Sequence, residues 1–312
     1  MNATLTADSP PAADQPVHRR FEDATTCDGV IWFGNVDWWY HNRGHASTRM
    51  ANRVAQCVPT CWINSIGMRM PVPGRTEIAT KRYLRKLKSL TKGLRRDEAT
   101  GMYVYSPLFV PKYTPRWVEF NGRLLAWQVG IVLRRLGVRR PSACVSMPTM
   151  VPAVERRPWV SVVFDRCDDF TTLPEANSHV AELERRLLDM CDHAAYVNQP
   201  LYERERDTIS DAQMIGHGVD YEQFVAARPL EGERIARPAE LQPLTGPIVG
   251  FYGGMDDYRM DAELMIRIAR RLAGRNGSLV LLGPEQMDLS RVKSEPNVHA
   301  LGQKPPDRKS VV

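Results

Sequence analysis

The chain has 312 residues, of which 43% are hydrophobic and 25% charged, and its net charge is +6 with a pI near 9.0. This is the composition of a globular protein, and the length indicates two domains. The longest apolar runs have only the length of strands, which argues against a membrane-spanning helix. Residues 1–28 lack the apolar stretch of a signal peptide, and we expect them to form a disordered leader.

The residues after this leader alternate between strand-like and helix-like segments. Apolar runs of strand length lie at 30–34, 61–66, 103–107, 143–147, 160–164, 194–198 and 213–216. Segments with helical periodicity lie at 47–56, 121–136, 176–191 and 201–207. In the segment 121–136 the expected inward side includes Leu125 and Trp127. The alternation predicts a parallel α/β domain over residues 29–227.

A basic segment interrupts this pattern at residues 81–96. It carries eight lysines and arginines and no acidic residue, with leucines at spacings close to helical. The pattern predicts a basic amphipathic helix that suits an anionic membrane surface or a polyanionic ligand. The alternative is a solvated helix that packs its leucines on the domain core. No motif for nucleic-acid binding accompanies the charge, so we expect no nucleic-acid partner.

A proline-rich, charged stretch at 228–246 is typical of an interdomain linker. A second α/β segment follows at 247–312, with strands expected at 248–252, 278–282 and 298–301 and a helix at 262–273. A parallel sheet covered by helices normally has more strands. We therefore expect an incomplete second domain.

The six cysteines form no CxxC pair and no zinc-like spacing, which indicates reduced thiols rather than a disulfide framework or a metal site. They are Cys27, Cys57, Cys61, Cys144, Cys167 and Cys191.

Three motifs could carry chemistry. In the first, a strand ends on Gly253 and Gly254, and Arg259 follows. A phosphate could approach the backbone of the two glycines closely, and the arginine could neutralise its charge. The alternative is a glycine-rich turn that only connects the strand to a helix. In the second, His217 begins the short string His-Gly-Val-Asp before the linker. In the third, the carboxylates Asp165, Asp168 and Asp169 follow a strand and suit acid/base work, metal binding, helix capping or pairing with arginines.

The ordered series of these segments resembles the family 4-like GT-B glycosyltransferases, especially the bacterial enzymes of surface-polysaccharide and teichuronic-acid type. The matching segments are 31–34, 47–48, 62–71, 165–170, 182–184, 195–198, 217–220, 247–253, 282–284, 296–298 and 301–302. The resemblance implies two Rossmann-like domains and transfer of a sugar from a UDP- or GDP-linked donor to a glycan or lipid-linked acceptor. It implies neither a catalytic metal nor a further cofactor.

Residue by residue, the resemblance implies three groups of site residues. Donor-binding residues are Gly253, Gly254, Arg259, Gly283, Pro284 and His217. Acceptor-side residues are Gly34, His45 and Ser47. Catalytic residues are Asp168, Asp169 and Arg259, where Arg259 would stabilise charge on the leaving diphosphate. The expected location is cytoplasmic, with a peripheral position at the inner face of the plasma membrane.

The chain also departs from the family pattern. Family members usually continue further and carry two glutamates in an E-x7-E pattern, which has no counterpart after Leu301. The alternative function is therefore a truncated, inactive remnant that at most binds acceptor or membrane. A metal-dependent GT-A transferase that uses Asp165 and Asp168, or Asp256 and Asp257, is less consistent with the pattern, because neither pair has D-x-D spacing.

Overall fold

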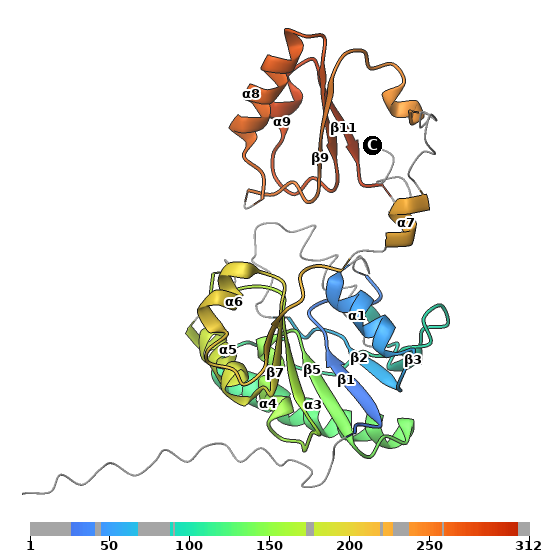
Figure 1. Cartoon of the computed structure of the whole chain (residues 1–312), viewed down its shortest axis with the longest axis vertical. Coiled ribbons are helices and arrows are strands. Elements are labelled where there is room, and N and C mark those ends of the chain that lie inside the picture. The colour runs from blue at the N-terminus through green and yellow to red at the C-terminus, as the bar shows by residue number, and fades with distance from the viewer. Residues whose placement is uncertain are drawn as a thin grey trace, which may run out of the picture. The chain divides into compact units, whose positions relative to one another are not determined.

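The structure is a computed structural model that describes residues 26–40, 45–67, 88–89, 91–172, 178–218, 221–226, 237–257 and 259–304. The chain divides into two compact units, Met1–Val219 and Asp220–Val312, which are described separately (Figure 1). Most of the predicted leader and the first half of the predicted linker lie outside the described residues.

The first unit is built on an eight-stranded sheet with the order β3-β4-β2-β1-β5-β6-β7-β8. All neighbouring strands are parallel except β3 and β4. The strands are β1 (Gly29–Phe33), β2 (Thr60–Ile63), β3 (Leu94–Arg96), β4 (Tyr103–Tyr105), β5 (Pro141–Val145), β6 (Val162–Arg166), β7 (His193–Tyr196) and β8 (Ala212–Met214). The helices are α1 (Ala46–Val54), α3 (Pro115–Leu136), the 3-10 helix η1 (Pro148–Met150), α4 (Val151–Val154), α5 (Ser178–Met190) and α6 (Gln199–Glu205).

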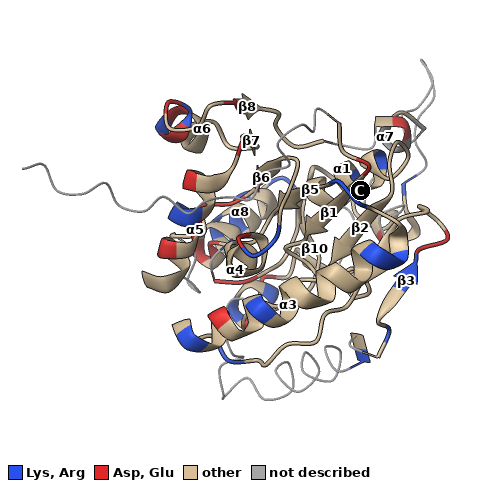
Figure 2. Ribbon diagram, turned by 90° about the horizontal axis from the view of Figure 1, so that it is seen from below, with Lys and Arg blue, Asp and Glu red and all other residues tan. Residues whose placement is uncertain are grey.

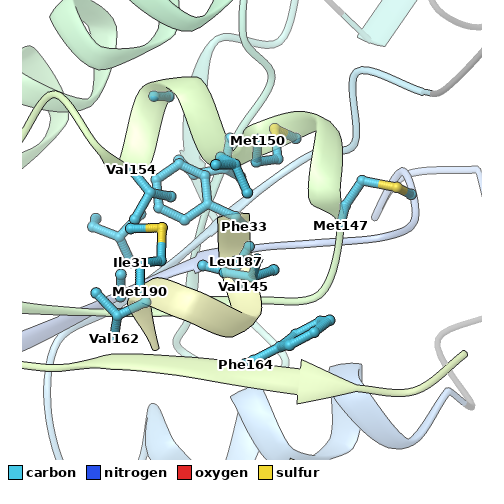
Figure 3. Close-up of a cluster of buried hydrophobic side chains, with 14 of the residues drawn as sticks. Ile31, Phe33, Val145, Met147, Met150, Val154, Val162, Phe164, Leu187 and Met190 are labelled. Atoms are coloured by element: carbon cyan, nitrogen blue, oxygen red, sulfur yellow. The ribbon is translucent and has the colours of Figure 1, made fainter. Parts of the chain in front are cut away.

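Both faces of the central strands of this sheet are buried, as expected for parallel strands that form continuous apolar runs. On one face, alternate residues of β1, β5 and β6 pack against α4, η1 and α5; Phe33, Val145 and Phe164 are among them (Figure 3). On the other face, Trp32 stacks on Trp62 with ring centroids 6.1 Å apart. The side-chain period of two in a strand therefore divides the core into two clusters.

Helix α3 differs from the prediction in its start and its orientation. It begins at Pro115, because proline suits the first turn of a helix, and ends at Leu136, where Gly137 caps it with a left-handed φ of +70°. Leu125 is buried as predicted, but Trp127 is 62% exposed, so its predicted inward position is wrong. Two residues along a helix correspond to a rotation of about 200°, which places Trp127 on the side opposite Leu125.

The predicted basic helix at 81–96 is wrong at its C-terminal end. Residues 81–87 and 90 lie outside the described residues, but Leu94–Arg96 form strand β3, antiparallel to β4 with Leu94 opposite Tyr105. Gly93, with φ of +55°, precedes the strand. A strand at the edge of a sheet tolerates charged side chains, so its composition does not show strand periodicity.

The second unit contains a three-stranded parallel sheet with the order β11-β10-β9. Its elements are α7 (Tyr221–Ala226), η2 (Ala239–Leu241), β9 (Ile248–Tyr252), α8 (Ala262–Ala273), β10 (Ser278–Leu282), α9 (Ser290–Lys293) and β11 (Val298–Gly302). The central strand β10 is buried along its whole length, whereas no residue of the edge strand β9 is fully buried. Asp261 starts α8 by accepting a hydrogen bond from the Leu264 backbone N–H at 2.9 Å.

Two further findings concern the whole described chain. All six cysteines are free thiols. None of the helices in the described ranges has the length and apolar character needed to cross a bilayer.

Candidate functional site

In the first unit, the carboxyl ends of β1 and β5 mark the point where the strand order reverses. From β1 the chain first builds outward through β2 and β4, and it then returns to build β5 to β8 on the other side of β1. The Ser146 backbone N–H donates to the Phe33 carbonyl oxygen at 2.9 Å, which ties the two strand ends together. Doubly wound sheets bind ligands at this switch point, so polar side chains there are candidate site residues.

The predicted acceptor-side residues lie on the β1 side of this point. Gly34 directly follows β1, and a Cβ atom there would lie 2.1 Å from the Trp62 ring. Packing alone therefore requires glycine at 34, and its acceptor role stays a prediction. His45 is the exposed N-cap residue of α1, and Ser47 is buried in the first turn of that helix.

Asp165, which belongs to the third motif but has no role assigned by the resemblance, lies buried at the same edge. Asp165 is 1% exposed and accepts a hydrogen bond from the Ser146 hydroxyl at 2.6 Å. The Ser146 oxygen in turn accepts one from the Trp32 indole N–H at 2.8 Å. The second carboxylate oxygen, Oδ1, makes no hydrogen bond of normal geometry to a described residue.

The surroundings of Asp165 determine its protonation. Burial raises the pKa of Asp165, while the hydroxyls of Ser146 and Ser47 and the nearby His45 act in the opposite direction. The nearby Asp168 raises the pKa further. A buried carboxylate with a raised pKa at a switch point is a candidate for holding or transferring a proton.

The predicted catalytic residues Asp168 and Asp169 lie in the loop after β6. Asp168 is exposed. Asp169 pairs with Arg204 at 3.0 Å and accepts a hydrogen bond from the Thr171 hydroxyl at 2.6 Å. Burial opposes ionisation of Asp169, but these hydrogen bonds outweigh it and hold its pKa below the ordinary value. Asp169 is therefore an ionised, paired carboxylate.

The loop itself is held by a buried arginine that the sequence did not single out. Arg166 has no exposed side-chain area and makes a bidentate pair with Glu205, through Nε at 3.0 Å and Nη2 at 2.9 Å. It also pairs with Glu184 and donates to the Asp168 carbonyl oxygen at 2.6 Å. Burial would raise the pKa of Glu205, yet the hydrogen bonds from Arg166 and Arg204 hold it below its ordinary value.

A signal for this cluster does exist in the sequence. Glu184 directly follows the buried Leu183 and lies four residues after the buried Val180, so it falls on the apolar side of α5. A charged residue on an apolar helix side needs a buried partner. The sequence alone does not identify Arg166 as that partner, because 18 positions separate the two residues.

In the second unit, two glycines that were predicted to bind the donor lie against each other at the carboxyl ends of β9 and β10. Gly253 has φ of +148° and Gly283 has φ of +149°. The Gly253 N–H donates to the Leu282 carbonyl oxygen at 2.9 Å. A Cβ atom at Gly283 would lie 1.8 Å from the Gly253 oxygen, so only glycine fits there.

The cation predicted for this loop lies beside the same glycines. Arg259 pairs with Asp256 through its guanidinium, and its backbone N–H donates to the Asp256 carboxylate at 2.9 Å. A Cβ atom at Gly254 would lie 3.8 Å from the Arg259 Nη1. The Arg259 side chain is 63% exposed and the Asp256 side chain 17% exposed, so Asp256 orients a guanidinium that solvent can reach.

Backbone contacts extend this edge to Pro284. The Met255 N–H donates to the Pro284 carbonyl oxygen at 3.1 Å, which joins the loop after β9 to the loop after β10. The structure therefore brings together Gly253, Gly254, Gly283, Pro284 and Arg259. Side-chain-free backbone next to an exposed guanidinium can accommodate phosphate oxygens.

His217, the remaining predicted donor-binding residue, belongs to the first unit. It is exposed and follows β8, whereas the other predicted donor-binding residues belong to the second unit. Its role stays a prediction. Within the described ranges, no three His, Cys, Asp or Glu side chains form a group that could hold a metal ion.

Comparison with solved structures identifies the fold. Sucrose-phosphate synthase from Thermosynechococcus elongatus superposes with a TM-score of 0.59 at 14% identity, over 91% of this chain and 72% of that chain. HepE from Anabaena, in complex with UDP and glucose, gives 0.53 at 12% identity, over 90% and 70%. UDP-GlcNAc 2-epimerase from Neisseria meningitidis, bound to UDP-GlcNAc, gives 0.50 at 11% identity, over 90% and 74%.

These similarities confirm the predicted fold class, the two-domain Rossmann-like GT-B architecture. No protein-family model matches the sequence, and no curated protein matches it. At such low identities the similarity shows the fold alone, so a function must be argued from the site residues.

Proposed function

We propose that this protein is a glycosyltransferase that moves a sugar from a nucleotide-diphosphate sugar to a cell-surface polysaccharide or lipid-linked acceptor. The proposal rests on one observation in the second unit. At the carboxyl ends of β9 and β10, Gly253 contacts Gly283, and the exposed Arg259 side chain lies beside Gly254. The anionic diphosphate of a nucleotide sugar suits such an edge. When the sugar is transferred, negative charge develops on the departing diphosphate, and Arg259 would stabilise that charge.

The comparisons support the class of donor. HepE was solved with UDP and with UDP-glucose, and the epimerase with UDP-GlcNAc, on the same fold. By this analogy, we infer that the donor nucleotide here is uridine diphosphate. Because the epimerase shares the fold, transfer must be distinguished from epimerisation by experiment.

The carboxylates of the first unit divide between two roles in this proposal. Asp169, ionised and paired with Arg204, suits electrostatic stabilisation of the positive charge that develops on the transferred sugar. Asp165, a buried carboxylate with a raised pKa, suits proton transfer from an acceptor hydroxyl. Asp168 is exposed in the same loop and stays a candidate for either role.

The first test is nucleotide binding. Calorimetric titration with UDP should show binding, and Arg259→Ala should weaken it by about 10- to 100-fold, the range for loss of a charge-assisted hydrogen bond. Arg267→Ala is the matched control, because Arg267 is an exposed arginine on α8, outside the loops at this edge. Equal affinities of the two variants would contradict the role of Arg259.

The second test is turnover. The protein is incubated with radiolabelled UDP-glucose or UDP-GlcNAc, with and without a polyprenyl-phosphate-linked glycan. Label that moves to the lipid fraction supports transfer. Conversion of UDP-GlcNAc into its epimer without any transfer would refute the proposal in favour of an epimerase, and the absence of any UDP binding would refute it altogether.

A further inference from the structure

Helix α3 carries two large aromatic side chains on its solvent side. Trp127 is 62% exposed and Phe120 is 47% exposed. Single exposed apolar residues are common on protein surfaces, but tryptophan and phenylalanine are more often buried. The Phe120 ring lies edge-on to the Trp117 ring, with centroids 5.6 Å apart. The residues of α3 that face the core, such as Leu125 and Val129, lie on the other side of the helix.

Arginines share this side of the helix. Arg116, Phe120, Arg123, Trp127 and Arg134 follow one another at spacings of three, four and seven residues, which places them on one side of an α-helix. We call these five residues the outer stripe of α3. Figure 2 shows α3 with its bands of basic residues. Aromatic and basic side chains therefore alternate along a helix of 22 residues.

The charge of the outer stripe is not neutralised locally. Across the part of the chain that the structure describes, no ion pair involves Arg116, Arg123 or Arg134. The one acidic residue of α3 is Glu119, and it pairs with Arg156 and Arg186. The stripe thus presents unpaired positive charge beside exposed aromatic rings.

We propose that the outer stripe of α3 binds the surface of an anionic lipid bilayer, with Phe120 and Trp127 entering the headgroup region. Tryptophan is favoured at the boundary between headgroups and acyl chains, and arginines on the same helix are attracted to anionic lipids. Charge complementarity selects the bilayer over a protein partner, because the stripe lacks the continuous apolar centre of a protein interface. This inference does not depend on the proposed transferase activity.

The experiment measures binding of the full chain to sedimented vesicles, without donor or acceptor. Vesicles of phosphatidylcholine with phosphatidylglycerol should bind the protein, and vesicles of phosphatidylcholine alone should bind it far more weakly. Arg123→Ala with Arg134→Ala should lower the partition coefficient by about 30-fold, because each arginine near an anionic surface contributes about fivefold. Phe120→Ala with Trp127→Ala should lower it by about tenfold or more.

Matched variants separate the outer stripe from total charge. Arg267→Ala with Arg271→Ala removes the same net charge from exposed positions of α8 and should leave binding nearly unchanged. Trp127→Phe should keep binding but lose the quenching of tryptophan fluorescence by lipids brominated near the headgroup. The substituted side chains of α3 are exposed, so we expect each variant to keep the circular dichroism spectrum of the parent.

Three results would overturn the inference. The first is equal loss of binding in the α3 and α8 arginine pairs, which would show a general charge effect. The second is unchanged binding after removal of both aromatic residues. The third is a change of molar mass in solution when the stripe is altered, which would assign this side of the helix to contact between copies of the chain.

Discussion

Replacing Gly283 by alanine tests whether the contact between the two glycine loops holds the donor edge of the second unit together. The new Cβ atom would lie 1.8 Å from the Gly253 oxygen, whereas real Cβ contacts essentially never fall below 3.0 Å, so the loops must separate by about 1.2 Å. The backbone at 283 also has φ of +149°, which is costly for a residue with a side chain.

The expected cost is the sum of two contributions. Alanine in this backbone region costs about 1–3 kcal/mol. Separation of the loops weakens the hydrogen bond from Gly253 to Leu282 and its neighbours, at about 1 kcal/mol each. We therefore expect Gly283→Ala to lower the stability of the second unit by about 2–5 kcal/mol and to weaken UDP binding more than about tenfold.

Gly253→Ala is the matched control, because Gly253 has nearly the same φ but no atom within 4 Å of the added Cβ. It should cost only the backbone contribution. Hydrogen exchange followed by mass spectrometry, on peptides that cover β10 and β11, measures the local stability in both variants. If the two variants agree within about 0.5 kcal/mol, the contact between the loops does not stabilise this edge and the reasoning is refuted.

Two further predictions concern the first unit. Arg166→Met should lower the free energy of unfolding by about 3–5 kcal/mol, because Glu184 would lose its buried ion-pair partner and Glu205 would keep the exposed Arg204 but lose the buried guanidinium. Urea unfolding should show this loss shrinking as the pH falls and the glutamates take up protons. A loss no larger than that of the exposed control Arg185→Met would contradict the role of the cluster. Asp165→Asn should cost less than about 1 kcal/mol at pH 8. Burial raises the pKa of Asp165, so the stability that this side chain contributes is present below its unfolded pKa and is lost as the pH rises through the folded pKa. Asp165→Asn should therefore show a smaller decline in stability as the pH rises above about 4, the ordinary pKa of an aspartate, and an unchanged decline would argue against this protonation.

The sequence predicted the strands of both sheets well for a physical reason. Parallel strands that are covered on both faces appear as short apolar runs, and β1 and β10 are clear examples. The sequence-based prediction failed at β3, because an edge strand needs no apolar run. Its basic residues are as typical of the solvent side of a helix as of an edge strand. The predicted inward position of Trp127 is also wrong, because hydrophobicity alone does not decide which side of a helix an aromatic residue occupies.

The candidate site was predictable where local backbone chemistry defines it. Gly253 and Gly283 mark strand ends in the sequence, and both have positive φ in the structure. The direct contact between them was not visible, because it joins positions 30 residues apart through sheet register. In the same way, the pairing of Arg166 with Glu205 and the approach of Ser146 to Asp165 depend on elements that only the folded sheet brings together.

The position of Arg166 has a consequence for how the first unit opens. The arginine sits at the end of β6, and its two glutamates belong to α5 and α6. If α6 detached alone, Glu205 would leave, and the Nε and Nη2 donors of the buried Arg166 would lose their acceptor. Local fraying of α6 is therefore costly, and the segment from β6 to α6 should behave as one cooperative unit of unfolding, with the loop that carries Asp168 and Asp169 held inside it.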